Sequence, residues 1–164
     1  MKRLLIAAAA AILSFTAAQA GEMKFPSDAP VASITLPESW IGKETDTGIE
    51  VSSEDDAIYF FIDVADVKST DAVITDAIKF LSDNGVTIDP ASLKESKDQK
   101  LNGMDIAFLE WNGTDKDGPA SIGMAIAAAS AENLLVLTYW GTKGDEEKHA
   151  VELGTMIDSL KPVK

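Results

Sequence analysis

The sequence predicts an α+β protein with a single antiparallel sheet of about six or seven strands and two main helices. Two helical patterns, at 69–84 and 144–161, are separated by a run of strand patterns, which is typical of an antiparallel sheet. The stretch 101–142 contains three consecutive strands joined by tight turns. Several strands are apolar on both faces, so we expect both faces of the sheet to be covered.

The first twenty residues differ in composition from the rest of the chain. Two basic residues precede an apolar run from Leu4 to about Phe15, and Ala18-Gln19-Ala20 ends the segment. This pattern predicts a secretory signal peptide at 1–20, cleaved after Ala20. A transmembrane anchor is the competing interpretation, but it needs ~20 apolar residues, more than this run provides. We therefore expect a periplasmic or secreted protein.

Composition restricts the possible partners. The chain has 164 residues, enough for one domain at 31–164 preceded by a short arm at 21–30. Its net charge of −13 at pH 7 makes nucleic acid and anionic lipid poor partners. It has no cysteine, which excludes disulfides, thiolate chemistry and a lipid-modified cysteine. No second apolar run is long enough for membrane insertion. We expect the protein to be a monomer or a weak dimer.

The first half of the chain predicts an arm, four strands and a helix. Residues 21–30 are polar and contain proline, so we expect them to lack regular structure. Apolar alternation predicts strands at 31–36, 41–44, 48–53 and 57–67. Ser69 or Thr70 can cap a helix that ends near Asn84, before Gly85. Its apolar stripe comprises Val73, Ile74, Ala77, Ile78, Phe80 and Leu81.

The second half predicts a meander and a final helix. Three lysines between residues 93 and 100 are typical of a weak strand at a solvent-exposed edge. Asn102-Gly103 supplies the positive φ angles of a hairpin turn, and Asp115-Lys116-Asp117-Gly118 forms the next turn. The final helix at 144–161 buries Ala150, Leu153, Ile157 and Leu160. We expect the two helices to cover opposite faces of the sheet.

No residue pattern predicts a catalytic residue or a metal ligand. His149 is the one histidine, and a Ser-His-Asp arrangement would need it beside a serine such as Ser121 or Ser159. Without cysteines, a zinc site would depend on this histidine and carboxylates alone. Glycosidase-like carboxylates could come from Asp63, Asp105 or Glu110, but their spacing selects no pair.

Aromatic residues are the better candidates for a binding site. Trp40, Trp111, Tyr139 and Trp140 lie near strand ends, where they could line a groove. Trp and Tyr combine apolar area with a hydrogen-bonding group, which suits them to binding. The alternative for each of them is packing in the core.

Four segments resemble the PsbP/DcrB-like superfamily of antiparallel α/β/α sandwiches. They are ITLPESW at 34–40, LNGMDIAFLEW at 101–111, LTYW at 137–140 and MIDSLK at 156–161. The resemblance implies a non-catalytic factor, because its members include extrinsic photosystem proteins, envelope proteins of Gram-negative bacteria and chaperones for secreted effectors.

The sequence thus favours a secreted or periplasmic binding or accessory protein without a cofactor. Its partner would be a protein or peptide of the cell envelope, or a small apolar ligand. The alternative is a periplasmic hydrolase whose active site follows no recognised pattern.

Overall fold

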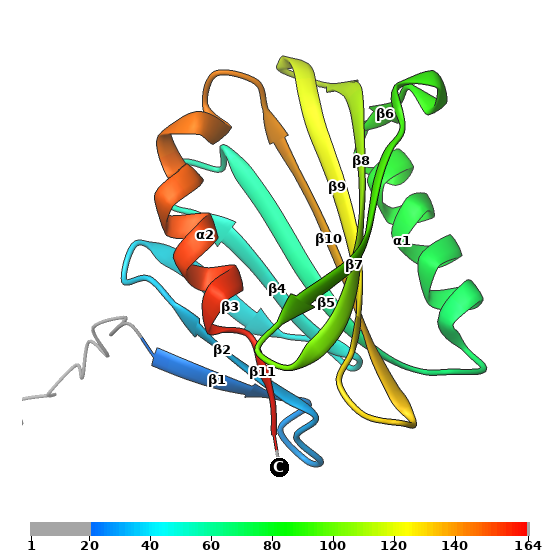
Figure 1. The fold of residues 1–164 in the computed structure, drawn as a ribbon. Helices are drawn as coiled ribbons and strands as arrows, with labels where there is room; N and C mark the ends of the chain where they lie inside the picture. Colours follow the sequence, from blue (N-terminus) through cyan, green and yellow to red (C-terminus); the bar gives the residue numbers. More distant parts are fainter. Residues whose placement is uncertain (1–20, 164) are drawn as a thin grey trace, which may run out of the picture.

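The computed structural model describes residues 21–163 (Figure 1). It contains two α-helices, α1 (Thr70–Asp83) and α2 (Ala150–Ser159), and two 3-10 helices, η1 (Pro90–Ser92) and η2 (Glu146–His149). The strands are β1 (Gly21–Phe25), β2 (Ala32–Leu36), β3 (Trp40–Glu44), β4 (Gly48–Ser53), β5 (Ile58–Asp66), β6 (Thr87–Ile88), β7 (Lys94–Leu101), β8 (Met104–Asp115), β9 (Gly118–Ala128), β10 (Asn133–Thr142) and β11 (Lys161–Pro162). The signal peptide expected at 1–20 lies outside the described residues.

Eight strands form the main sheet, and all their pairings are antiparallel. Their order is β3-β4-β5-β10-β9-β8-β6, and β7 also pairs with β8. A second, three-stranded sheet has the order β1-β2-β11, so the antiparallel strands form two sheets and not the expected single one. The antiparallel α+β fold is therefore confirmed. The main sheet has more than the expected six or seven strands because β6 and β7 both pair with the long strand β8.

The two helices cover opposite faces of the main sheet, which confirms the prediction from its two apolar faces (Figure 1). On one face, Phe60, Ile106 and Leu135 belong to a buried cluster with Met156 and Leu160 at α2. On the other face, Phe61, Met124 and Val136 cluster with Ala77 of α1. Burial of apolar area on both sides is the main term that stabilises such a sandwich.

Residues 21–25 form strand β1 instead of an arm without regular structure. Gly21 pairs with Leu36 and Phe25 pairs with Ala32, so the segment lies along one edge of β2. Phe25 is fully buried. Backbone pairing and the burial of this ring outweigh the local preference of a polar, proline-containing sequence.

The N-terminus of α1 is capped differently from the prediction. Neither Ser69 nor Thr70 caps the helix with its side chain, and both hydroxyls donate to the carbonyl of Asp66. The carboxylate of Asp66 instead accepts the backbone N–H groups of Lys68 at 2.7 Å and Ser69 at 2.9 Å. The predicted apolar stripe of α1 is also not buried throughout, because Ile78 is 45% exposed.

The final helix is shorter than predicted and has a different buried stripe. It begins with the 3-10 turn η2, and α2 proper covers only Ala150–Ser159. Ala150 is exposed, whereas Met156, which the predicted stripe omits, is fully buried. Leu160 is buried and Leu153 packs against the core, as predicted, so the difference is confined to Ala150, which directly follows η2, and to the added Met156.

The Asn102-Gly103 turn joins the β7–β8 hairpin to the end of α2. Both residues have positive φ angles, 49° and 89°, which confirms the predicted turn. The side-chain amide of Asn102 donates to the carbonyls of Asp158 at 2.7 Å and Leu160 at 2.8 Å. One residue thus shapes a turn and satisfies carbonyls at a helix C-terminus.

Candidate functional site

The four aromatic residues expected to form a groove do not share one surface. Trp40 is 3% exposed and belongs to the core on the α2 side, where its indole N–H donates to Glu152 at 3.1 Å. Trp111 and Trp140 pack on the α1 side. Tyr139 packs on the α2 side. Successive strand residues point to opposite faces, so the sheet itself separates Tyr139 from Trp140.

The aromatic residues on the α1 side hold the helix to the sheet. Trp140 stacks on Tyr59 with ring centroids 4.7 Å apart, and Phe80 of α1 lies 6.0 Å from Tyr59 and 6.2 Å from Trp140. Phe80 also meets Phe61 edge-on at 5.2 Å. Offset and edge-on contacts of this kind stabilise a core. Trp140 therefore has a packing role.

His149 is held between two carboxylates. Its Nδ1 lies 2.9 Å from Glu152, and its Nε2 lies 3.0 Å from Asp55. The hydrogen bonds to Glu152 and then to Asp55 raise the pKa of His149. The hydrogen bond to His149 and a second one to Ser53 lower the pKa of Asp55 to about 2.

In this arrangement neither ring nitrogen of His149 contacts a serine hydroxyl. A general base needs a ring nitrogen within hydrogen-bond reach of the hydroxyl, and both nitrogens of His149 already contact carboxylates. Ser121 donates instead to Glu146 at 2.6 Å, and Ser159 donates to the carbonyl of Met156. The two serines weighed as nucleophiles therefore lie against other groups.

The carboxylates weighed for acid catalysis are also separated. Asp63 faces α1, accepts a hydrogen bond from Thr47 at 2.5 Å, and has its pKa raised by burial. Asp105 is exposed and paired with Lys100. Glu110 lies on the face opposite to that of Asp105, because successive residues of β8 alternate between the two faces and one position number is even while the other is odd. Among residues 21–163, no three histidine and acidic side chains are placed to hold a metal ion.

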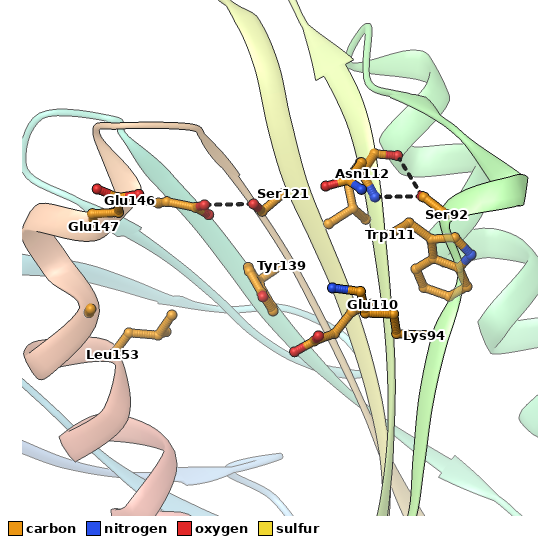
Figure 2. A pocket seen from close by; sticks show the side chains of 12 residues that line it. Ser92, Lys94, Glu110, Trp111, Asn112, Ser121, Tyr139, Glu146, Glu147 and Leu153 are labelled. Carbon is orange, nitrogen blue, oxygen red and sulfur yellow. Dashed lines mark hydrogen bonds between the residues drawn. The ribbon is translucent and has the colours of Figure 1, made fainter.

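A cleft between the N-terminal part of the last helix and the sheet is the best candidate for a binding site (Figure 2). We call it the α2 cleft. Its volume is about 320 Å³. The sheet contributes Glu110, Ser121 and Tyr139, and the helical side contributes Glu146, Glu147, Ala150 and Leu153. Lys94, Ser92 and Asn112 lie at the β7–β8 end of the cleft (Figure 2).

The register of the central strands creates the floor of the α2 cleft. Glu110 of β8 pairs with Gly123 of β9, and Gly123 pairs with Tyr139 of β10. A Cβ atom on Gly123 would lie 1.9 Å from Cε1 of Tyr139, so the aromatic ring lies directly over this glycine. The absence of a side chain at 123 therefore lets the Tyr139 ring form the floor.

Charge in the α2 cleft is mostly negative. Burial, and after it the negative charges of Glu110 and Glu146, raise the pKa of Tyr139 to about 12. The phenol is therefore neutral at physiological pH. Glu110 and Glu147 are exposed at the rim, whereas Glu146 is partly buried and accepts the hydrogen bond of Ser121. The cleft offers an apolar aromatic floor below a ring of carboxylates.

The sequence did not indicate that the helical residues of this cleft line a site. It indicated Glu110, Ser121 and Tyr139 of the sheet, but for roles other than this cleft. Tyr139 was expected in a groove with tryptophans, and Glu110 was weighed as a catalytic acid. One pattern could have indicated the cleft: Glu110 follows Met104, Ile106 and Phe108 on the same face of β8. A carboxylate at the end of an apolar stripe predicts that the helix covering this face of the sheet no longer covers it at that position.

Comparison with known proteins shows what the fold is similar to. No family model matches the sequence, and no curated protein matches it. The solution structure of cyanobacterial PsbP (CyanoP) from Synechocystis sp. PCC 6803 matches with a TM-score of 0.60 at 10% identity, covering 95% of this chain and 98% of that one. The fold is PsbP-like. The resemblance seen in the sequence is thus confirmed at the level of the fold.

Other solved structures share the PsbP-like fold. LpqN of Mycobacterium tuberculosis, involved in cell envelope biogenesis, has a TM-score of 0.53 at 9% identity and covers 88% of this chain and 91% of its own. The Saccharomyces cerevisiae Ran-binding protein Mog1p has a TM-score of 0.51 at 14% identity, covering 85% and 93%. A Bacteroides thetaiotaomicron protein matches with a TM-score of 0.53 at 14% identity. The match covers 81% of this chain but only 45% of the length of that protein.

The described residues carry no membrane-spanning helix. Neither helix between residues 21 and 163 combines the length and the apolar character needed to cross a bilayer.

Proposed function

We propose that the protein is a non-catalytic accessory protein of the bacterial envelope that binds a partner protein through the α2 cleft. The α2 cleft is the observation that carries this proposal. Its volume of about 320 Å³ is at the lower end of the ~300–1,000 Å³ typical of ligand pockets. A space of this size suits one long side chain of a partner better than a large ligand.

The chemistry of the cleft favours a lysine or arginine side chain. The apolar stem of such a residue can lie on the ring of Tyr139 and against Leu153, while its charged end reaches Glu110 and Glu146. The net charge of −13 favours approach by basic partners. A basic segment of an envelope protein is therefore the occupant that we propose.

The comparisons support an accessory role by analogy. LpqN is described as involved in cell envelope biogenesis, and Mog1p is described as a Ran-binding protein. The PsbP-like fold is thus used by an envelope protein and by a protein-binding protein. Export by the segment 1–20 would place this chain in the same compartment as its proposed partner.

Photo-crosslinking at two adjacent residues of α2 tests the proposal. Ala150 is exposed and lines the cleft, whereas the neighbouring Val151 is 81% exposed and does not line it. We expect a photoreactive residue at 150 in the native host to capture a partner that the same residue at 151 does not capture. Glu110→Gln and Glu146→Gln should weaken the capture, and added salt should weaken it further.

Equal capture from both positions, or capture that is unaffected by the two carboxylate variants, would contradict the cleft as the binding site. The competing hydrolase would be supported by turnover of an ester, glycoside or peptide substrate that His149→Ala abolishes. The contacts of His149 do not favour that outcome, because both of its ring nitrogens already face carboxylates.

A further inference from the structure

A second cavity lies on the opposite side of the sheet from the α2 cleft. It is partly open to solvent and is lined by Ile78 and Leu81 of α1, Ile88 of β6, Pro90 of η1, Trp111 of β8, Ile122, Gly123 and Met124 of β9, and Thr138 of β10. Its volume is about 260 Å³. We call it the α1 cavity. It is distinct from the α2 cleft because the sheet lies between them.

Two hydrophobic clusters meet at the α1 cavity without filling it. Met124 belongs to the cluster that packs around Ala77, whereas Leu81 and Ile122 belong to a separate cluster with Val86. Protein interiors are normally close-packed, with few voids larger than a water molecule. A space of this size between two clusters therefore offers room for an apolar occupant.

The lining of the α1 cavity contains one side-chain hydroxyl, that of Thr138. This residue is fully buried, and its Oγ1 has no hydrogen-bond partner; among residues 21–163 it is the one buried side-chain N or O atom found without a partner. An unsatisfied buried hydroxyl costs stability. An occupant that brings one polar atom within reach of this hydroxyl would supply the missing hydrogen bond.

Water does not suit the α1 cavity. A buried water normally makes about three hydrogen bonds, whereas the side chains that line this cavity carry only two polar groups, the hydroxyl of Thr138 and the indole N–H of Trp111. Apolar cavities of about 150 Å³ stay dry and bind molecules such as benzene. The α1 cavity, at about 260 Å³, has room for a somewhat larger molecule.

The α1 cavity opens toward solvent near Ile78 and Pro90. Ile78 is 45% exposed although it lines the cavity, and Pro90 is exposed on the facing 3-10 helix η1. No lysine, arginine or histidine lines the cavity, so a carboxylate or phosphate would find no charge partner there. We infer that the α1 cavity binds a small neutral molecule that is mostly apolar and carries one hydrogen-bonding group, such as an aromatic or aliphatic alcohol.

Two ligands of nearly equal shape test this inference. Benzyl alcohol carries the hydroxyl group, and ethylbenzene replaces it with a methyl group. We expect both to shift the methyl NMR signals of Ile122 and Met124 saturably, and to leave those of Ile62 and Leu160 in the other core unchanged. Each affinity is corrected for the free energy of transferring that ligand from water into an apolar solvent. After this correction, benzyl alcohol should bind more tightly than ethylbenzene.

Three variants locate the site and its polar contact. Thr138→Val should weaken the affinity for benzyl alcohol by up to ~10-fold, because one hydrogen bond contributes about that much, and should leave the affinity for ethylbenzene unchanged. Ile78→Trp should block both ligands at the entrance. Ile41→Trp is the matched control, since Ile41 is 63% exposed on the distant strand β3, and it should bind both ligands like the wild type.

The inference would be overturned by shifts that do not saturate, or by shifts that appear equally in the α2-side core. Unchanged binding by Ile78→Trp would also overturn it. The NMR comparison on the wild-type protein decides the matter even if one of these variants does not fold.

Discussion

His149 joins two parts of the fold that are distant in sequence. It lies at the junction of η2 and α2, and its side chain contacts Asp55 in the turn between β4 and β5. The imidazolium form can donate from both ring nitrogens, to Glu152 and to Asp55, whereas the neutral ring has one N–H only. Protonation therefore decides whether both contacts are hydrogen bonds.

This contact predicts a stability maximum on the acidic side of neutrality. The pKa of His149 is raised, so its contribution is complete below pH ~6.5 and is lost as pH rises through the raised pKa. The pKa values of Asp55 and Glu152 are lowered, so their contributions are complete above pH ~4.5 and are lost as pH falls. The contact should be strongest between these limits.

Thermal unfolding at pH 5.5 and pH 8.5 measures this effect. We expect the wild type to lose more Tm between the two values than His149→Gln does. Lys148→Gln is the control, because Lys148 is the exposed neighbour and pairs with Asp145. An identical loss of Tm in the wild type and His149→Gln would show that this contact does not set the pH dependence.

Thr138 gives a second prediction at a single residue. Thr138→Val keeps the shape of the side chain and removes a fully buried hydroxyl that has no partner, so we expect a gain of ~1 kcal/mol in the free energy of unfolding. Thr142→Val is the matched control on the same strand. Its hydroxyl donates to Asp115 at 2.8 Å, and its removal should destabilise the protein in the same urea titration.

Among the elements, β9 depends on glycine for its contact with β10. Gly123→Ala would place a methyl group within the ring of Tyr139, and such overpacking typically costs ~1–3 kcal/mol. Gly154→Ala is the contrasting variant, because a Cβ atom there meets nothing within 4 Å and lies on helix α2. It should stabilise the protein by ~0.5–1 kcal/mol. Equal effects of the two variants would contradict the close contact at Gly123.

The elements also show how far the sequence could predict the structure. Alternation located the strands, and the two apolar faces of β5 and β10 predicted a helix on each side. The buried stripe of the last helix was right at Leu153 and Leu160 and wrong at Ala150, where the 3-10 turn η2 has only just given way to α2. Such a turn leaves no mark in the apolar spacing that helix prediction uses.

The candidate site was less predictable than the elements. The α2 cleft forms only because the strand register places Glu110, Gly123 and Tyr139 in one row across three strands. Register is a property of pairing between distant segments, and no local pattern specifies it fully. The tryptophans were prominent in the sequence, yet their rings belong to the packing on the two sides of the sheet.

For the whole molecule, export is the property that the sequence predicts most specifically. We expect the mature protein to begin at Gly21, because Ala18 and Ala20 are the small residues that precede the predicted cleavage site. Intact mass spectrometry of protein recovered from the periplasm tests this. Ala20→Arg should slow processing and leave the precursor in the cell. A secreted species that retains residues 1–20 would contradict the prediction.

The small sheet imposes an order on the completion of the fold. Strand β2 pairs with β1 on one side and with β11 on the other, where Lys161 meets Ser33. In a chain that emerges from a translocation channel N-terminus first, β1 and β2 appear together, but the partner for the other edge of β2 arrives among the last residues. Until then that edge is an open template on which a foreign strand can add. During such export, the interval between the emergence of Ser33 and that of Lys161 would leave this edge of β2 without its own partner strand.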